Sequence, residues 1–389
     1  MELETKNGLV KIYAKTLEET AKTQIIEMAN APIGENANIR IMPDAHAGAG
    51  CVIGTTMKIT NKICPNLVGV DIGCGVDLVK TNLDFDSLEM QQALDKVIRE
   101  KIPYGKEIAS DRREFPFHEL RCWDKLKKQV KDNAYYSLGT LGGGNHFIEA
   151  YRNGYLSVHS GSRNIGYKVA EYYQNLAIKR CFEEKIANRK IEIKNIPPRV
   201  REKFLKDNRI EFSKDLAYLT DQDMEDYLYD IKIIQKFAVK NRTLILETIV
   251  KALGGVIEST ITSTHNYIDT DNMILRKGAI SAKEGELLVI PLNMKDGLLI
   301  CKGKGNEDWN YSAPHGAGRL YSRTEAKKVI KLDDFKKAME GIYSTCINEN
   351  TLDESPFAYK DWQEIVGCIQ PTVDIQERII PIYNFKAEG

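Results

Sequence analysis

Short apolar segments that end abruptly in glycine-rich polar turns recur along this chain, and they constrain its fold more than any other feature. Such segments occupy residues 39–42, 67–70, 156–158 and 287–290. Apolar or β-branched runs of this length, bounded by turn residues, are typical of buried strands. We therefore expect a strand at each of the four places.

Two longer stretches have the periodicity of helices. Residues 86–101 begin with Asp86 and Glu89 at capping-box spacing, carry apolar residues on one side and stop before Pro103. Residues 223–253 carry apolar residues at steps of three and four, and a glycine pair follows as a stop signal. Both stretches predict amphipathic helices.

The 389 residues suffice for one elaborate domain or two ordinary ones. The chain has no internal repeat, low-complexity tract or linker, so a single domain over residues 1–389 is the simpler interpretation. Strand-rich segments surround a mostly helical excursion at about 166–255. We expect an α+β fold of mixed β-sheets flanked by helices.

The charges of the chain balance, with 55 Lys and Arg residues against 55 Asp and Glu residues. Any attraction for nucleic acid must therefore come from local patches. Residues 125–131 and 199–206 are basic, but neither stretch carries the interleaved aromatic residues of a base-stacking surface. We interpret both as solvated helix faces.

The sequence favours a cytoplasmic protein with no membrane association. The N-terminal 30 residues lack the layout of a secretory signal, and no apolar run approaches the ~18 residues that span a bilayer. The eight cysteines are scattered and have no secretory context, so we expect reduced thiols.

The histidines stand in unusual surroundings. Five of the six lie in turns rich in glycine and small polar residues: His46, His146, His159, His265 and His315. Glycine allows the backbone to approach a ligand closely, and successive amides in such turns can bind anions. A single histidine is more often a hydrogen-bonded structural residue than a ligand. Five in similar turns indicate a common site.

The segment GVDIGCG at 69–75 places Asp71 and Cys74 three residues apart, after the apolar run that predicts a strand. A buried cysteine is usually a small hydrophobic residue. Beside a carboxylate and several histidines, however, Cys74 becomes a candidate thiolate ligand for zinc, manganese or iron. The spacing of a structural zinc site is missing, so these ligands must assemble from distant segments, as catalytic sites do.

His315 is the candidate nucleophile. Glycines follow it at two positions, and Arg319 lies where a guanidinium can clamp phosphate oxygens. Imidazole can attack phosphorus and form a covalent phosphoramidate, and nearby divalent metals would neutralise the developing charge. The chain has no GxxxxGK[ST] motif, which argues against a P-loop ATPase.

Together, these motifs resemble those of the RtcB family of RNA ligases. The resemblance is carried by MPDAH (42–46), GVDIGCG (69–75), LGTLGGGNHFIE (138–149), HSGSR (159–163), HN (265–266) and HGAGR (315–319). It spans about residues 44–386 and implies the RtcB-like fold, with a metal site in a central cleft.

In that family, GTP guanylylates a histidine, and the guanylyl group passes to an RNA 3′-phosphate that derives from a 2′,3′-cyclic phosphate. A 5′-hydroxyl end then attacks and releases GMP. The resemblance implies that His315 is the nucleophile and that two manganese ions are bridged by Cys74. The implied metal ligands are Asp71, Cys74, His146, His159 and His265.

The resemblance also implies contacts with the substrates. The implied nucleotide contacts are Asn145, Glu149, Asn266, Asn293 and Lys386. Arg163 and Arg319 are implied phosphate contacts, and Asp44 and His46 line the same site. The implied partners are RNA ends in repair or tRNA splicing and an archease-like activator.

The chain departs from the family pattern at residues 291–297. Most members carry Pro-Gly-Ser-Met-Gly there, whereas this chain has PLNMKDG, so a serine expected near the nucleotide is missing. The same segment lacks the intervening residue of the Lys-x-Asp-Gly pattern, which disfavours a lysine-based nucleotidyltransferase.

Two other functions remain open on the sequence alone. A two-metal centre can activate water against a cyclic phosphate, which would make the chain a phosphoesterase. A non-catalytic protein that binds RNA or a translation factor can keep such a site as a scaffold. The second alternative needs the loss of active-site groups, yet each residue named for the nucleophile and the metals is present.

Overall fold

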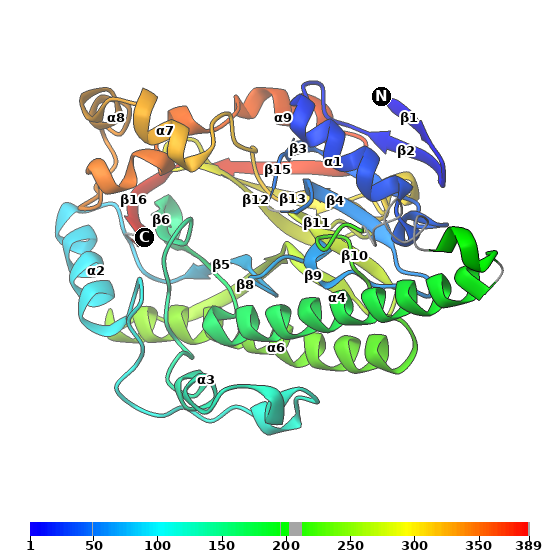
Figure 1. Cartoon of the computed structure of the whole chain (residues 1–389). Coiled ribbons are helices and arrows are strands. Elements are labelled where there is room, and N and C mark those ends of the chain that lie inside the picture. Colours follow the sequence, from blue (N-terminus) through cyan, green and yellow to red (C-terminus); the bar gives the residue numbers. More distant parts are fainter. Residues whose placement is uncertain (49, 195, 202–211, 388–389) are drawn as a thin grey trace.

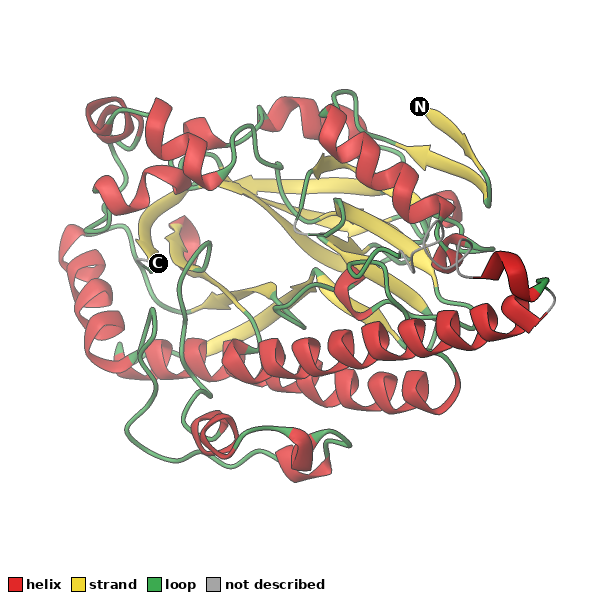
Figure 2. Cartoon of the chain, in the orientation of Figure 1, coloured by secondary structure: helices red, strands yellow, loops and turns green. Residues whose placement is uncertain are grey.

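The structure is a computed structural model that describes residues 1–48, 50–194, 196–201 and 212–387. Its strands lie between layers of helices (Figure 1; Figure 2), which confirms the predicted α+β fold of mixed sheets flanked by helices. None of the helices in those ranges combines the length and apolar character that crossing a membrane requires. The single-domain organisation over 1–389 stays a prediction.

A six-stranded sheet gathers strands from the N-terminal part and the middle of the chain. In spatial order its strands are β1 (Glu2–Thr5), β2 (Gly8–Ile12), β3 (Arg40–His46), β4 (Ile53–Lys58), β10 (Ile274–Lys277) and β9 (Asn266–Asp269). β2 and β3 pair in parallel, and the other neighbours pair antiparallel. The register pairs His46 with Ile53 and Lys277 with Asn266, so these residues share one end of the sheet.

A five-stranded antiparallel sheet carries most of the chemistry. In spatial order its strands are β16 (Pro381–Lys386), β6 (Phe147–Tyr151), β7 (Tyr155–Ser160), β5 (Gly75–Thr81) and β8 (Ile257–Thr264). Its register pairs Gly75 with both Ser160 and Thr264, and Phe147 with both His159 and Lys386. The residues that flank β5, β6, β7 and β8 at this end are therefore neighbours in space, although the sequence separates them widely.

Both faces of this sheet are buried along β16, β6, β7 and β5, whereas much of the edge strand β8 is exposed. One face packs on a three-stranded sheet of β12 (Leu287–Asn293), β13 (Gly297–Gly303) and β15 (Val373–Ile379), through a core that includes Val76, Leu78, Val289 and Leu298. The other face packs on helix α6 (Asp221–Ala252). A short pair, β11 (Ala279–Ser281) and β14 (Ser312–Pro314), ends directly before His315.

Helices α4 (Arg163–Lys194) and α6 run side by side along the outside of the strands (Figure 1). They confirm the helical excursion predicted for about 166–255. The remaining α-helices of the described ranges are α1 (Glu19–Asn30), α2 (Leu88–Lys101), α3 (Lys128–Ala134), α7 (Arg323–Val329), α8 (Leu332–Ala338) and α9 (Trp362–Ile369).

The helix predicted at 86–101 is present as α2, but its predicted cap is wrong. Ser87 is the N-cap residue, and its side chain accepts a hydrogen bond from the backbone N–H of Met90. Asp86 instead lies in a local turn before the helix, where its backbone N–H donates to the Asp84 carboxylate at 2.9 Å. The helix therefore begins one residue later than the capping-box spacing indicated.

Three of the four predicted strands are confirmed as parts of β3, β7 and β12, whereas the strand predicted at 67–70 is wrong. Pro65 starts a 3₁₀ turn (Pro65–Leu67). Leu67 and its neighbour Val68 are both buried, so this apolar run packs into the core as part of a turn rather than as a buried strand. Gly69 then turns the chain with a φ of 96°. The Asp71–Cys74 segment consequently lies in a turn before β5.

The basic stretch at 125–131 lies in a short 3₁₀ turn and in α3, and most of its lysines are exposed, in agreement with a solvated face. In the stretch at 199–206, residues 202–206 lie outside the described residues. All eight cysteines are free thiols, and Cys368 alone among them is partly exposed.

Candidate active site

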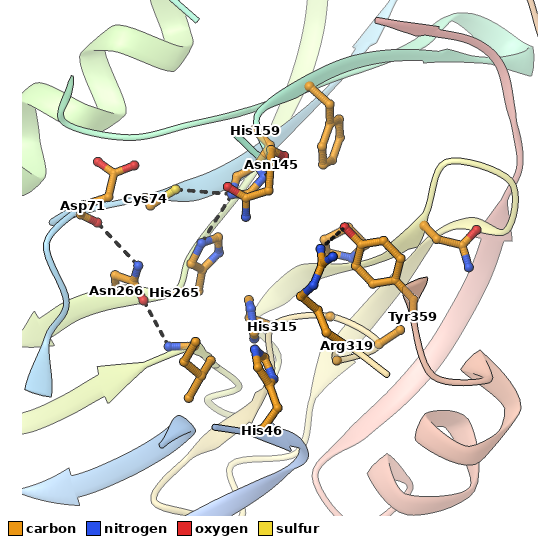
Figure 3. A pocket seen from close by; sticks show the side chains of 18 of the residues that line it. His46, Asp71, Cys74, Asn145, His159, His265, Asn266, His315, Arg319 and Tyr359 are labelled. Atoms are coloured by element: carbon orange, nitrogen blue, oxygen red, sulfur yellow. Dashed lines mark hydrogen bonds between the residues drawn. The ribbon is translucent and has the colours of Figure 1, made fainter. Parts of the chain in front are cut away.

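A cavity of about 390 Å³ lies where the ends of the five-stranded and six-stranded sheets meet. Its lining includes His46, Asp71, Cys74, Asn145, His159, His265 and His315. Figure 3 shows these side chains converging from separate strands and turns. The structure thus brings together residues that are up to 269 positions apart, counted from His46 to His315.

Cys74, His146 and His159 form a compact buried cluster. The Cys74 Sγ atom lies 3.2 Å from Nε2 of His159 and 3.5 Å from Nε2 of His146. One donor atom from each residue lies within 4.8 Å of the others, which is a spacing that one metal ion can bridge. Nε2 of His265 lies 3.4 Å from Nε2 of His159 and extends the cluster towards His315.

Asp71 adds a carboxylate to this cluster. Its Oδ2 atom lies 3.2 Å from Nε2 of His146, and its Oδ1 atom accepts the backbone N–H of Ser162 at 2.9 Å. Burial by itself raises the pKa of Asp71, but the contact with His146 and the nearby Arg163 outweigh it and lower the pKa to about 2. The carboxylate is therefore ionised and available as a ligand near neutral pH.

The orientation of the rings fits a metal. Nδ1 of His146 lies 2.7 Å from the carbonyl of Leu141, and Nδ1 of His159 lies 3.1 Å from the carbonyl of Asn145. A carbonyl only accepts, so Nδ1 carries the proton in both rings and Nε2 faces the cluster. Metal-binding histidines are oriented by the same kind of backbone contact.

The protonation states also fit. Burial lowers the pKa of His159 and of His265 well below the usual range, so both rings are neutral and have a lone pair to offer. Burial and the neighbouring Asp71 raise the pKa of the Cys74 thiol. A cation at the cluster would therefore displace protons as it binds. This donor set suits zinc, manganese or iron and does not choose among them.

His315 lies at the other side of His265, with the two ring centroids 4.9 Å apart. Its Nδ1 atom is 2.6 Å from Oδ2 of Asp44, and its backbone N–H donates to the same oxygen at 3.1 Å. Asp44 is fully buried in β3. The carboxylate therefore contacts the ring at Nδ1 within ion-pair distance, although not with the angles of a hydrogen bond, and Nε2 is left as the nitrogen able to react.

The family described as tRNA-splicing ligase RtcB matches residues 24–122 and 119–387 of the chain. The chain belongs to the RtcB family. The RNA-splicing ligase RtcB of Escherichia coli K12 is 31% identical over 417 aligned positions that cover 96% of each protein. The tRNA-splicing ligase RtcB of Nanoarchaeum equitans is 26% identical and covers 84% of this chain and 83% of its own length. RNA-splicing ligase RtcB2 of Escherichia coli ATCC 25922 is also 26% identical, over 96% of this chain and 93% of its own.

Several residues that the RtcB resemblance implies as nucleotide contacts line the cavity but already have partners. Nζ of Lys386 donates to Oε2 of Glu354 at 2.8 Å and to the carbonyl of Asn145 at 3.3 Å. Glu149 accepts hydrogen bonds from Tyr151 (2.6 Å) and Asn384. Burial raises the pKa of Glu149.

Asn266 and Asn293, two further implied nucleotide contacts, also have partners already. Oδ1 of Asn266 accepts the N–H of Gly278 at 3.0 Å. Asn293 lies where the sequence departs from the RtcB pattern, as the last residue of β12 before the turn to β13. Its Oδ1 atom accepts the N–H groups of Lys295 and Asp296, and its Nδ2 atom donates to the Asp296 carboxylate at 2.7 Å. The side-chain amide of Asn293 is therefore engaged within its own turn.

The two arginines implied as phosphate contacts differ in position. Arg319 lines the cavity, and its guanidinium contacts the Glu354 carboxylate at 3.4 Å and the Asp353 carbonyl at 2.6 Å. Arg163 is absent from the lining of this cavity. It lies in a neighbouring hollow, where its guanidinium contacts Thr140 and the carbonyl of Gly105.

His46 lies beside the nucleophile candidate, at the end of β3. Its Nδ1 atom is 3.0 Å from the backbone carbonyl of Asp44. Burial lowers the pKa of His46, and the proximity of His315 lowers it further. A neutral imidazole next to His315 is suited to accept or donate a proton during transfer.

Two charged residues had no signal in the sequence: Lys277, which lines the cavity, and Glu354, which contacts three cations of the lining. Glu354, which is 2% exposed, lies in a 3₁₀ segment (Glu349–Glu354) and faces Lys386, Arg319 and Arg323. Lys277 is 7% exposed at the end of β10, and its Nζ atom lies 2.8 Å from Sγ of Cys51. Neither residue stands in a glycine-rich motif, so spacing alone did not single it out.

Proposed function

We propose that this chain is a GTP- and manganese-dependent RNA ligase. It would join RNA ends that carry a 3′-phosphate or a 2′,3′-cyclic phosphate to 5′-hydroxyl ends. Membership of the RtcB family, whose relatives are named as RNA- and tRNA-splicing ligases, supports an RNA substrate. The observation that carries the proposal is the placement of His315, which lies between the buried Asp44 carboxylate and the His265 ring.

In the first step, Nε2 of His315 attacks the α-phosphorus of GTP. A nitrogen–phosphorus bond forms, the bond to the departing pyrophosphate breaks, and the histidine carries GMP. Asp44 keeps the ring oriented through Nδ1 and stabilises the positive charge that develops on it. His46 is the neighbouring group that can exchange a proton with the reacting phosphates.

In the second step, an oxygen of the RNA 3′-phosphate attacks the GMP phosphorus, and the bond to His315 breaks. The RNA then ends in a 3′-diphosphate-linked guanosine. In the third step, the 5′-hydroxyl oxygen attacks the phosphorus next to the RNA 3′-oxygen and GMP leaves. A 2′,3′-cyclic phosphate would first be hydrolysed to the 3′-phosphate.

Asp71, Cys74, His146, His159 and His265 would hold two manganese ions. The bound ions would neutralise charge on the phosphates and orient them for in-line attack. The five side chains supply the carboxylate, thiolate and imidazole donors that such a site needs, and the contacts of His146 and His159 with backbone carbonyls keep their donor atoms aimed at it.

The remaining cavity residues would bind the substrates. We assign nucleotide contacts to Asn145, Glu149, Asn266, Asn293 and Lys386. Arg319 on the cavity wall and Arg163 in the adjoining hollow would bind phosphates of the RNA. Lys386 and Arg319 share the buried Glu354, so an arriving phosphate would compete with that carboxylate for both cations.

The setting of the reaction is part of the proposal. RNA repair or tRNA splicing in the cytoplasm would supply the ends, and an archease-like activator would assist the first step.

The deciding experiment incubates the purified chain with GTP labelled at the α-phosphate, together with Mn²⁺, Zn²⁺, Co²⁺ or Mg²⁺ in parallel. Acid-labile label on the protein is expected with Mn²⁺. It should vanish in His315→Ala and persist in His118→Ala, because His118 is exposed and does not line the cavity. A labelled enzyme should then join RNA ends.

The other functions would give different results. A phosphoesterase would release phosphate from a 2′,3′-cyclic end without labelling His315. A non-catalytic RNA-binding protein would hold RNA and metal but show neither label nor phosphate release. Either result would overturn the ligase assignment.

A further inference from the structure

Arg242 is a fully buried arginine in the middle of α6, outside every motif that carries the family resemblance. Its Nε atom donates to Asp77 at 2.8 Å, in an ion pair whose side chains are 0% and 1% exposed. Its Nη1 atom donates to the carbonyls of Gly73 (2.8 Å) and Ser160 (3.1 Å). Its Nη2 atom lies 3.5 Å from Oγ1 of Thr264.

Apart from Asp77, the partners of Arg242 share one property, because each is the immediate chain neighbour of a side chain in the cluster of candidate metal ligands. Gly73 precedes Cys74, Ser160 follows His159, and Thr264 precedes His265. One guanidinium therefore touches the backbone or side chain beside three cluster residues. The planar guanidinium has five N–H donors in a fixed fork, which is enough to make these contacts. The ammonium group of a lysine has only three donors and no fixed fork.

Asn241 extends the same contacts to the fourth residue of the cluster. Its Oδ1 atom accepts the N–H groups of Gly139 (2.6 Å) and Thr140 (3.0 Å), and its Nδ2 atom donates to Oγ of Ser160 at 3.1 Å. That hydroxyl in turn donates to the carbonyl of Leu141 at 2.8 Å. The same carbonyl contacts Nδ1 of His146 at 2.7 Å.

A gain in stability does not explain why the ion pair of Arg242 and Asp77 is buried. Moving two charges out of water costs so much that a buried ion pair is often no better than well-packed apolar side chains of equal volume. A fully buried Arg242 with Asp77, beside a fully buried Asn241, is therefore better explained by the groups that these side chains hold in place.

We infer that Asn241 and Arg242, which both belong to α6, are positioning residues for the cluster of candidate metal ligands. They fix Cys74, His146, His159 and His265 at mutual distances that a metal ion requires. The inference rests on the metal site of the proposed function, but it concerns the geometry of the ligands rather than the reaction with RNA.

The test compares Arg242→Lys and Asn241→Ser with the unchanged chain in titrations with Co²⁺. This probe gives a thiolate-to-metal charge-transfer absorption when Cys74 binds it. Loss of partners that orient metal ligands typically weakens metal binding by about 10- to 100-fold. We expect that loss in both variants, together with a weaker or shifted absorption band, at temperatures where circular dichroism shows folded protein.

Asp230→Asn is the matched control. Asp230 is fully buried on the same helix, and it accepts hydrogen bonds from the backbone of Arg121 and Cys122 and from the hydroxyl of Tyr173, none of which belongs to the cluster. This control should lose thermal stability yet bind Co²⁺ like the unchanged chain.

Wild-type Co²⁺ affinity and an unaltered band in both Arg242→Lys and Asn241→Ser would overturn the inference. Weaker binding in Asp230→Asn as well, in proportion to lost stability, would also overturn it. The proposed function fails separately, if the unchanged chain gives the Co²⁺ band but joins no RNA ends; the positioning role then stands. An unchanged chain that binds no Co²⁺ would overturn both.

Discussion

The contact between His315 and Asp44 shows what a single buried carboxylate can contribute to this site. Asp44 is 0% exposed, and its Oδ1 atom has no hydrogen-bond partner among the described residues. A carboxylate without solvent or further donors interacts more strongly with the ring beside it, because little competes for its charge. Its Oδ2 atom accepts the backbone N–H of His315 and also faces the ring of that residue. One oxygen atom therefore both positions His315 and places a negative charge beside its ring.

Asp44→Asn tests this contribution, because the amide keeps the shape and removes the charge. We expect the rate of His315 labelling by GTP to fall by about 100-fold or more, since the ring loses the group that orients and stabilises it. Single-turnover labelling measures the rate, and thermal unfolding checks that the fold survives. A labelling rate close to that of the unchanged chain would show that Asp44 does not act on the ring.

Glu354 predicts a pH dependence of stability. Burial raises the pKa of Glu354, but Lys386, Arg323 and Arg319 outweigh burial and lower the pKa below its usual value. The stability from this group is therefore present above the unfolded pKa of about 4.3 and is lost as pH falls through the lower folded pKa. Glu354→Gln, which leaves buried cations unpaired, should cost about 3 kcal/mol at neutral pH.

Urea unfolding of the Glu354→Gln variant and the unchanged chain across pH measures this effect. The difference between them should shrink below about pH 4, where the unchanged chain also binds a proton at Glu354. Glu364→Gln is a suitable control, because Glu364 is partly exposed and its carboxylate accepts a hydrogen bond from Thr16 alone within the described residues. A difference that stays constant with pH would contradict the assigned role.

At the scale of elements, the sequence predicted what depends on local periodicity and missed what depends on packing. Apolar spacing found α6, because its buried residues recur along one face. The same criterion wrongly predicted a strand at 67–70, because a run of apolar residues has the same sequence pattern in a buried strand and in a turn that packs into the core. Local pattern contains no information on that choice.

The fit between α6 and the turn before β5 is such a packing feature. Gly73 has a φ of 75°, and a Cβ atom there would lie 2.8 Å from Cβ of Ala238 and 3.1 Å from Cα of Gln235 on α6. Gly73→Ala should therefore push the turn and Cys74 away from the helix. We expect a stability loss beyond the ~1 kcal/mol of a left-handed alanine, with weaker Co²⁺ binding.

Gly254→Ala isolates the conformational part of that effect. Gly254 follows α6 with a φ of 76°, yet a Cβ atom there would meet nothing within 4 Å. This variant should lose about 1 kcal/mol in urea unfolding and bind Co²⁺ normally. If Gly73→Ala behaves in the same way as Gly254→Ala, the close contact with α6 does not position Cys74.

At the scale of the whole molecule, the sequence identified the segments that form the site but could not show how the fold brings them together. Histidines in glycine-rich turns indicated a shared site, and the family resemblance named the cluster residues. The register of the five-stranded sheet, which brings the segments of Cys74, His159 and His265 to one end, follows from long-range pairing. For the same reason the sequence could not show that Arg163 stays outside the cavity lining or that Glu354 pairs with Arg319, Arg323 and Lys386, which belong to it.

Because the cluster joins segments from across the chain, metal binding should stabilise the whole fold. A metal that binds the folded chain alone adds about 2.7 kcal/mol at 100 times its Kd, which raises the melting temperature by a few degrees in a chain of this size. Excess Mn²⁺ should therefore raise the melting temperature of the unchanged chain, and a chelator should reverse the shift. Cys74→Ala should lose most of this response, whereas Cys301→Ala should keep it, because Cys301 is equally buried but lies in the three-stranded sheet. An equal Mn²⁺ response in both variants would mean that the metal binds elsewhere and that the converging segments are held by packing alone.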